Sequence, residues 1–156
     1  MIAAALIAFF VFFGLSGGGS FGELMTDYAK DPMKTTIVDE DRRTMALNEL
    51  HSLKGAIKDF NKNVSKDIKQ FDKLVKNYDS TPAEFDQMLS SVLANNKQDV
   101  EVIWERRSAM LAHITSDQWQ TIISSARATQ EKELAKKKAK AERKEEKQKQ
   151  PKAYPL

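Results

Sequence analysis

Residues 46–78 read ALNELHSLKGAIKDFNKNVSKDIKQFDKLVKNY, and apolar side chains recur in them every three or four residues. The recurring positions are Ala46, Leu50, Leu53, Ile57, Phe60, Val64, Ile68, Phe71, Val75 and Tyr78. This spacing is a heptad repeat with one extra four-residue step between Phe60 and Ile68, which is called a stutter. The pattern predicts a helix over residues 38–78. At 1.5 Å per residue it would be ~60 Å long, so it must pack along a partner.

Two further helices are predicted downstream. The second covers residues 82–112, and its seam consists of Phe85, Leu89, Val92, Asn96, Val100, Ile103, Arg107 and Met110. The third begins near Ser116 and runs to about residue 148, with an apolar stripe that fades after Ala126. Together the three patterns predict an all-α fold, an elongated antiparallel hairpin or three-helix bundle with coiled-coil character.

The composition excludes several other classes of protein. The chain has 156 residues, a net charge of +3 and no cysteine, so disulfide scaffolds, cysteine zinc sites and cysteine nucleophiles are excluded. From Glu23 to Gln150 there is one glycine and there are two prolines, too few for the turns of a β or α/β fold. No catalytic group, cofactor-binding loop or metal site is predicted, and we expect a protein that is not an enzyme.

Two helix starts carry the most specific local chemistry. Thr81 and Glu84 flank Pro82 in a capping box, in which the threonine hydroxyl and the glutamate each accept a backbone N–H at the start of the second helix. Thr115 and Gln118 form a second box. There Ile114 and Trp119 occupy the two positions of a hydrophobic staple. Both boxes are followed by the same pattern of an aromatic residue, two aliphatic residues and a Ser-Ser pair.

The N-terminal segment 1–22 is uncharged apart from the chain terminus, and residues 2–15 are continuously apolar. Its length suits either an uncleaved signal anchor or a cleaved signal peptide. Both interpretations predict an N-terminal hydrophobic helix and place the rest of the chain on the periplasmic or extracytoplasmic side of the inner membrane. Residues 23–37 are expected to be a tether with at most one short helical turn.

The segment Ile114-Thr115-Ser116-Asp117-Gln118 resembles the L-T-x-x-Q signature of periplasmic helical proteins, the Spy/CpxP-like chaperones and their metal-responsive relatives. The likeness covers residues 80–125. It departs from the signature at Ile114, which replaces the leucine, and in the first copy, where Ser80 and Glu84 replace the leucine and the glutamine. The resemblance implies a dimeric periplasmic hairpin that holds unfolded client proteins without ATP or senses envelope stress.

Other residues are candidates for binding. A surface for clients is suggested by Met88 and Met110 together with Arg106 and Arg107, although methionines at this spacing also suit core packing. His51 and His113 lie on different helices without a paired ligand, so no metal is expected. Asp39, Glu40 and Asp41 suit the N-terminal dipole of the first long helix better than a catalytic carboxylate pair.

The helical bundle is assigned to residues 38–128, and a basic tail that passes from helix to disorder is assigned to 129–156. From Glu131 onward the tail has ten basic and five acidic residues, a net charge of +5. Its candidate contacts with an anionic surface are Lys136, Lys137, Lys138, Lys140, Arg143 and Lys144.

The expected partners follow from these features. Leu, Ile, Val and Phe make up only 27 of the 141 residues from Ser16 onward, so the thin core predicts a homodimer. Unfolded or envelope proteins and the membrane are the other expected partners, and nucleic acid is not expected. The function predicted is a chaperone or stress-responsive adaptor, and the alternative is a membrane-anchored coiled-coil spacer that uses its basic tail.

Overall fold

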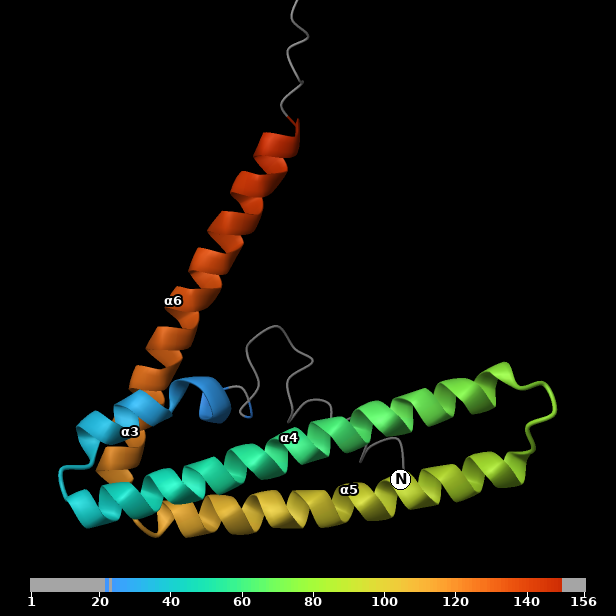
Figure 1. The fold of residues 1–156 in the computed structure, drawn as a ribbon, viewed down its shortest axis with the longest axis horizontal. Helices are drawn as coiled ribbons and strands as arrows, with labels where there is room; N and C mark the ends of the chain where they lie inside the picture. Colours follow the sequence, from blue (N-terminus) through green and yellow to red (C-terminus); the bar gives the residue numbers. More distant parts are fainter. Residues whose placement is uncertain (1–21, 23, 150–156) are drawn as a thin grey trace, which may run out of the picture. The chain divides into compact units, whose positions relative to one another are not determined.

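The computed structural model describes residue 22 and residues 24–149, and within these the regular elements are all helices, with no strand. The helical elements are the π-helix η1 (Leu24–Tyr28) and the α-helices α3 (Lys30–Thr36), α4 (Glu40–Lys76), α5 (Pro82–Leu111) and α6 (Ser116–Lys149) (Figure 1). The described residues divide into two compact units, one of residues 33–119 and the other of residues 22 and 24–32 with 120–149. The all-α prediction is confirmed.

Helices α4 and α5 lie side by side and form an antiparallel hairpin (Figure 1). Their bounds confirm the predicted helices at 38–78 and 82–112 to within two residues. Asp39 caps α4, since its Oδ1 accepts the backbone N–H of Arg42 at 2.8 Å, and Glu40 and Asp41 occupy the first turn as expected. Helix α4 ends where Asn77 leaves the helical conformation, and Pro82 then begins α5.

The core of the hairpin is concentrated near the ends of the two helices that lie opposite the 77–81 loop. Five seam residues of α4 are buried there: Ala46, Leu50, Leu53, Ile57 and Phe60. Helix α5 and the corner that follows it contribute Ile103, Met110 and Ile114. All eight except Ile114 were predicted as seam positions, and their burial confirms the heptad pattern in this half of the hairpin.

The stutter predicted after Phe60 is wrong. Ile68 and Val75 are 61% and 59% exposed, and Tyr78 is fully exposed. The partly buried positions are instead Asn63, Val64, Asp67 and Leu74, so the repeat of seven that begins at Ala46 continues through Val64 and Asp67 to Leu74, although Phe71 at one of its positions is 43% exposed. Helix α4 therefore keeps the same side toward α5 beyond Phe60, and this places the carboxylate of Asp67 between the two helices.

The segment 23–37 is not the tether expected from the sequence. Residues 24–28 form η1 and residues 30–36 form α3. Met25, Ala29, Met33 and Ile37 are each 0% exposed, and their spacing of four places them on one side of a helical segment. The mixed composition and the Asp31-Pro32 pair suggested an irregular segment. Proline is, however, compatible with the first turn of a helix, so it does not prevent α3 from forming here.

Helix α6 (Ser116–Lys149) confirms the third predicted helix, which was expected to run from Ser116 to about residue 148. Ile122, Ala126 and Gln130 are buried at a spacing of four, and no such stripe continues beyond Gln130. Packing of helix on helix is established only for α4 and α5 among the described residues, so the three-helix bundle over 38–128 is not confirmed.

The expected hydrophobic helix at residues 1–22 falls almost entirely on residues 1–21, which lie outside the described part of the chain. Within the described part, no helix is long and apolar enough to cross a bilayer.

Candidate functional site

The half of the hairpin next to the 77–81 loop does not close into an apolar core. A groove of about 620 Å³ lies here between α4 and α5. We call it the distal groove. It is lined by Asn63, Lys66, Asp67, Gln70 and Leu74 of α4 and by Glu84, Gln87, Met88, Ser91, Val92 and Asn95 of α5. Most of these side chains are polar, and three are apolar.

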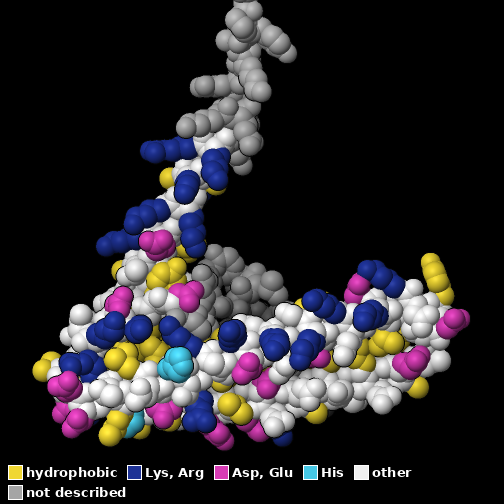
Figure 2. Space-filling view, viewed as in Figure 1, with side chains coloured by type: hydrophobic (Ala, Val, Ile, Leu, Met, Phe, Trp, Pro, Cys, Tyr) yellow, Lys and Arg dark blue, Asp and Glu magenta, His cyan; other side chains and the backbone are white. Residues whose placement is uncertain are grey.

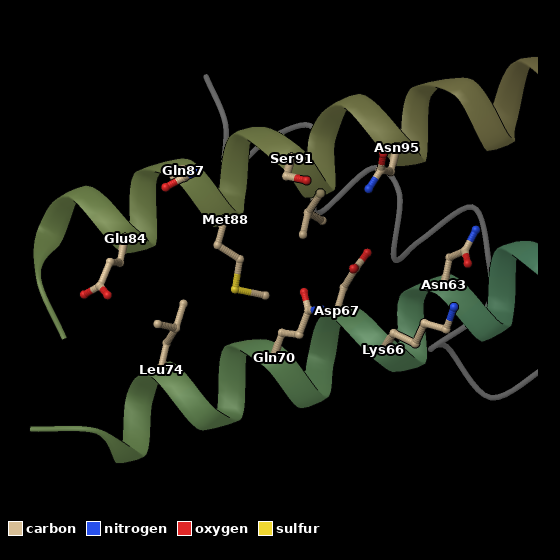
Figure 3. A pocket seen from close by; sticks show the side chains of 11 residues that line it. Asn63, Lys66, Asp67, Gln70, Leu74, Glu84, Gln87, Met88, Ser91 and Asn95 are labelled. Carbon is tan, nitrogen blue, oxygen red and sulfur yellow. The ribbon is translucent and has the colours of Figure 1, made fainter.

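The methionine of the distal groove is its most adaptable group. Figure 3 shows Met88 and Asp67 extending from opposite helices into the space between them. Met88 is half-buried, and its unbranched thioether side chain can adjust to irregular apolar surfaces. Leu74 and Val92 provide the other apolar parts of the lining. The groove can therefore receive an apolar side chain from a partner while its rim forms hydrogen bonds.

A polar layer at one end of the groove explains why the two helices do not close on each other. Asn63 Nδ2 donates a hydrogen bond to Asp99 Oδ2 at 2.9 Å across the hairpin. Asp67 Oδ2 and Asn96 Oδ1 are buried, and neither has a hydrogen-bond partner among the described residues. Buried polar atoms without partners are costly, so this layer weakens the hairpin just where the groove begins.

Aromatic and capping contacts hold the far end of the groove in place. The rings of Phe71 and Phe85 meet edge to face, with their centroids 6.0 Å apart. Ser80 Oγ donates to the carbonyl oxygen of Leu74 at 2.9 Å and ties the loop back to α4. These contacts keep the two helix ends together although the stretch between them and the core is underpacked.

Both predicted capping boxes are present. The Thr81 N–H donates to Glu84 Oε2 at 2.7 Å, and the Glu84 N–H donates to Thr81 Oγ1 at 3.4 Å. The Thr81 hydroxyl also donates to Glu84 Oε2 at 3.0 Å. The two hydrogen bonds that this carboxylate accepts, first from the Thr81 backbone and then from its hydroxyl, hold the pKa of Glu84 below its ordinary value of 4.5. The same exchange joins Thr115 and Gln118, at 3.0 and 3.3 Å.

The staple residues of the second box lie in different environments. Ile114 is 9% exposed, and Trp119 is half-buried. The guanidinium carbon of Arg107 lies 5.9 Å from the centre of the Trp119 ring and 5.2 Å from that of Trp104. Arg107 therefore bridges the end of α5 and the start of α6 by cation–π contacts, a role that its seam position did not suggest.

The four residues predicted as a client surface are not brought together. Met88 lines the distal groove, but Met110 is 0% exposed in the hairpin core and cannot touch a client. Arg106 is half-exposed and lies 3.9 Å from Glu49 of α4. Arg106 and Arg107 follow Met88 by about five helical turns, ~27 Å along α5. Of the four residues predicted as a client surface, only Met88 therefore lies in the distal groove.

The remaining candidates lie on the surface. Lys136, Lys137, Lys138, Lys140, Arg143 and Lys144 are all exposed on α6. His51 is exposed, and His113 is half-buried at the corner after α5, where its carbonyl accepts a hydrogen bond from Arg42 at 2.9 Å. Within the described ranges, no three acidic or histidine side chains gather in a way that could hold a metal ion.

Asp67, Gln70 and Leu74 were not predicted as groove residues, because the apolar residues Ile68 and Val75 suggested a stutter. Continuing the strict repeat of seven past Val64 would have found Asp67 and Leu74. The polar centre of the second seam, at Asn96 and Asp99, was visible in the sequence and marks the same layer.

No family model, no curated protein and no solved structure matches this chain.

Proposed function

We propose that the protein is a non-enzymatic binding module of the cell envelope that holds apolar segments of other proteins in the distal groove. The observation that carries this proposal is the groove itself, a space of about 620 Å³ between two helices with Met88, Leu74 and Val92 in its lining. An adaptable methionine among hydrogen-bonding side chains suits partners of varied sequence, as an ATP-independent chaperone or stress-responsive adaptor requires.

Three further features support the proposal. Ile68 and Val75 are exposed on α4 and Tyr78 in the loop that follows it, near the groove's end of the hairpin, which adds apolar surface that a partner could cover. Each of α5 and α6 begins at a reciprocal threonine cap, as the resemblance to the Spy/CpxP-like family implies. The apolar segment 1–22 suits an envelope location, either as a signal anchor or as a cleaved signal.

The test is suppression of aggregation. The purified full-length chain in mild detergent is added to a chemically denatured enzyme, and light scattering is followed on dilution. We expect suppression by the wild type and a clear loss for Met88→Gln, because the amide removes the apolar surface at the groove. Met45→Gln is the matched control, since Met45 is also exposed on the hairpin but lies outside the groove.

Two results would count against the proposal. No suppression at any molar ratio would exclude the chaperone function. Equal suppression by the two variants would show that clients bind elsewhere than in the distal groove.

A second function is favoured by a separate observation. All six candidate tail cations from Lys136 to Lys144 are exposed on a helix of 34 residues, ~51 Å long. We propose as the alternative a spacer or tether that joins envelope components through the N-terminal segment and the basic part of α6. A protein that works only as a spacer would show no aggregation suppression and would lose its attachment when the tail cations are removed.

A further inference from the structure

Seven lysines recur along one side of α4, and we call them the lysine stripe. They are Lys54, Lys58, Lys62, Lys66, Lys69, Lys73 and Lys76. Steps of three or four residues keep them on neighbouring positions of the helix surface. All are exposed except Lys54, which is half-buried, and Figure 2 shows a row of basic side chains along α4. From first to last the stripe is ~33 Å long.

The segment of α4 that carries the stripe has an excess of positive charge. Between Lys54 and Lys76 there are seven lysines and three aspartates, a net charge of +4. Asp67 faces the distal groove, and among the described residues the only ion pair of the stripe joins Lys76 to Asp72 at 2.6 Å. On a helix side that only faces solvent, basic and acidic side chains usually alternate and form ion pairs four residues apart.

We propose that the lysine stripe is a docking surface for the anionic headgroups of a lipid bilayer. A row of charges on one helix side can meet a planar, densely charged surface along its whole length, and each lysine near such a surface raises association about fivefold. Val75 is exposed near the end of the same helix and Tyr78 in the loop just beyond it, and tyrosine suits the boundary between headgroups and hydrocarbon.

The lipid surface is favoured over nucleic acid by two features of the chain. No aromatic residue lies among the lysines on the stripe side for bases to stack on, since Phe60 is buried and Phe71 packs on Phe85. The apolar segment 1–22 would also bring α4 within reach of a membrane. The inference therefore rests on the proposed envelope location, but it does not depend on client binding in the distal groove.

The absence of cysteine makes a direct test possible, because one introduced cysteine is the only labelling site. Ser65→Cys places an environment-sensitive fluorophore on the stripe side of α4, at an exposed position. The labelled full-length chain is reconstituted into neutral phosphatidylcholine vesicles or into vesicles that also contain phosphatidylserine. We expect an aqueous quencher to reach the label freely on the neutral vesicles and to be largely excluded on the anionic ones.

Three controls separate the stripe from other surfaces. The exclusion should be lost in high salt and in the variant Lys58→Gln/Lys62→Gln/Lys69→Gln/Lys73→Gln, which spares Lys66 of the groove. A label at Ala94→Cys, exposed on α5, should remain accessible on both kinds of vesicle. The quadruple variant should still suppress aggregation, so a failed stripe and a failed groove give different results.

Equal quenching at Ser65→Cys on both kinds of vesicle would overturn the proposal. Protection of this label by added duplex DNA, without protection by anionic vesicles, would assign the stripe to nucleic acid and would overturn it as well.

Discussion

At the scale of single residues, the threonine caps are the features in which sequence and structure agree most closely. A hydroxyl and a carboxyl or amide group three residues apart each satisfy a backbone N–H that the helix leaves without a partner. Such a device is local, so it can be identified in the sequence without knowing what the helix packs against. The cap residues Thr81, Glu84, Thr115 and Gln118 all make the predicted hydrogen bonds.

The cap of α6 can be tested by removing its hydroxyl. Thr115→Ala leaves the Gln118 N–H without its acceptor and should lower the free energy of unfolding by ~1 kcal/mol, measured by denaturant titration followed by circular dichroism. Thr129→Ala is the matched control. Thr129 lies within the same helix, and its hydroxyl bonds only to the carbonyl oxygen of Ser125, so its loss should cost almost nothing. Equal effects would show that the cap does not stabilise α6.

The cap of α5 should depend on pH through Glu84. Its pKa lies below 4.5 in the folded protein because the carboxylate accepts hydrogen bonds from Thr81. A lowered pKa stabilises the fold at all pH values above 4.5, and this contribution disappears as the pH falls through the lowered pKa. Wild type should therefore lose more thermal stability than Glu84→Gln between neutral and acidic pH. A larger loss in the variant would contradict this.

At the scale of helices, the sequence predicted α4, α5 and α6, because each begins at a cap and α4 and α5 carry a long apolar repeat. It failed where the apolar residues and the geometry of the hairpin disagree. Ile68 and Val75 suggested a stutter, but the packing that begins at Ala46 keeps the helix in register and turns Asp67 inward. The distal groove results from that conflict, so a list of apolar residues could not reveal it. The short helices at 24–36 were missed because they are brief and contain Pro32.

Because of this conflict, we expect a substitution of Asp67 to change the stability of the hairpin and client binding in opposite directions. Asp67→Leu would place an apolar side chain on the inner side of α4 and remove a buried carboxylate oxygen that has no partner among the described residues. We expect the free energy of unfolding to rise by about 1–2 kcal/mol and aggregation suppression to fall, since the groove is filled. Asp59→Leu, at an exposed position of the same helix, should change neither. A destabilised Asp67→Leu variant would show that the carboxylate has a stabilising role.

At the scale of the whole molecule, the candidate binding surfaces are divided between two parts of the chain. The distal groove and the lysine stripe both belong to the hairpin, whereas the basic residues from Lys136 onward belong to the other compact unit. The sequence indicated the tail because its charges are consecutive. The lysine stripe was not recognised in the sequence, because its lysines are separated by seam residues. They share one side only when the residues are placed on a helix.

Truncation after Arg127 separates these parts in one experiment. It removes the tail with its net charge of +5, so the remaining chain has a net charge of −2 (+3 minus +5), and the residues of the distal groove are retained. We expect aggregation suppression to stay within about twofold of wild type, because the apolar surface that contacts clients is unchanged. Binding to an anionic resin should need less salt for elution, since each cation contributes ~1 kcal/mol near an anionic surface. Some binding should remain, because the lysine stripe is intact.

The full-length variant Lys136→Gln/Lys137→Gln/Lys138→Gln/Lys140→Gln is the control for truncation, since it removes four charges and keeps the length of α6. It should elute between wild type and the truncated chain. If the truncated chain instead loses aggregation suppression and this variant keeps it, the helix beyond Arg127 takes part in holding clients. The distal groove alone would then be too small a site.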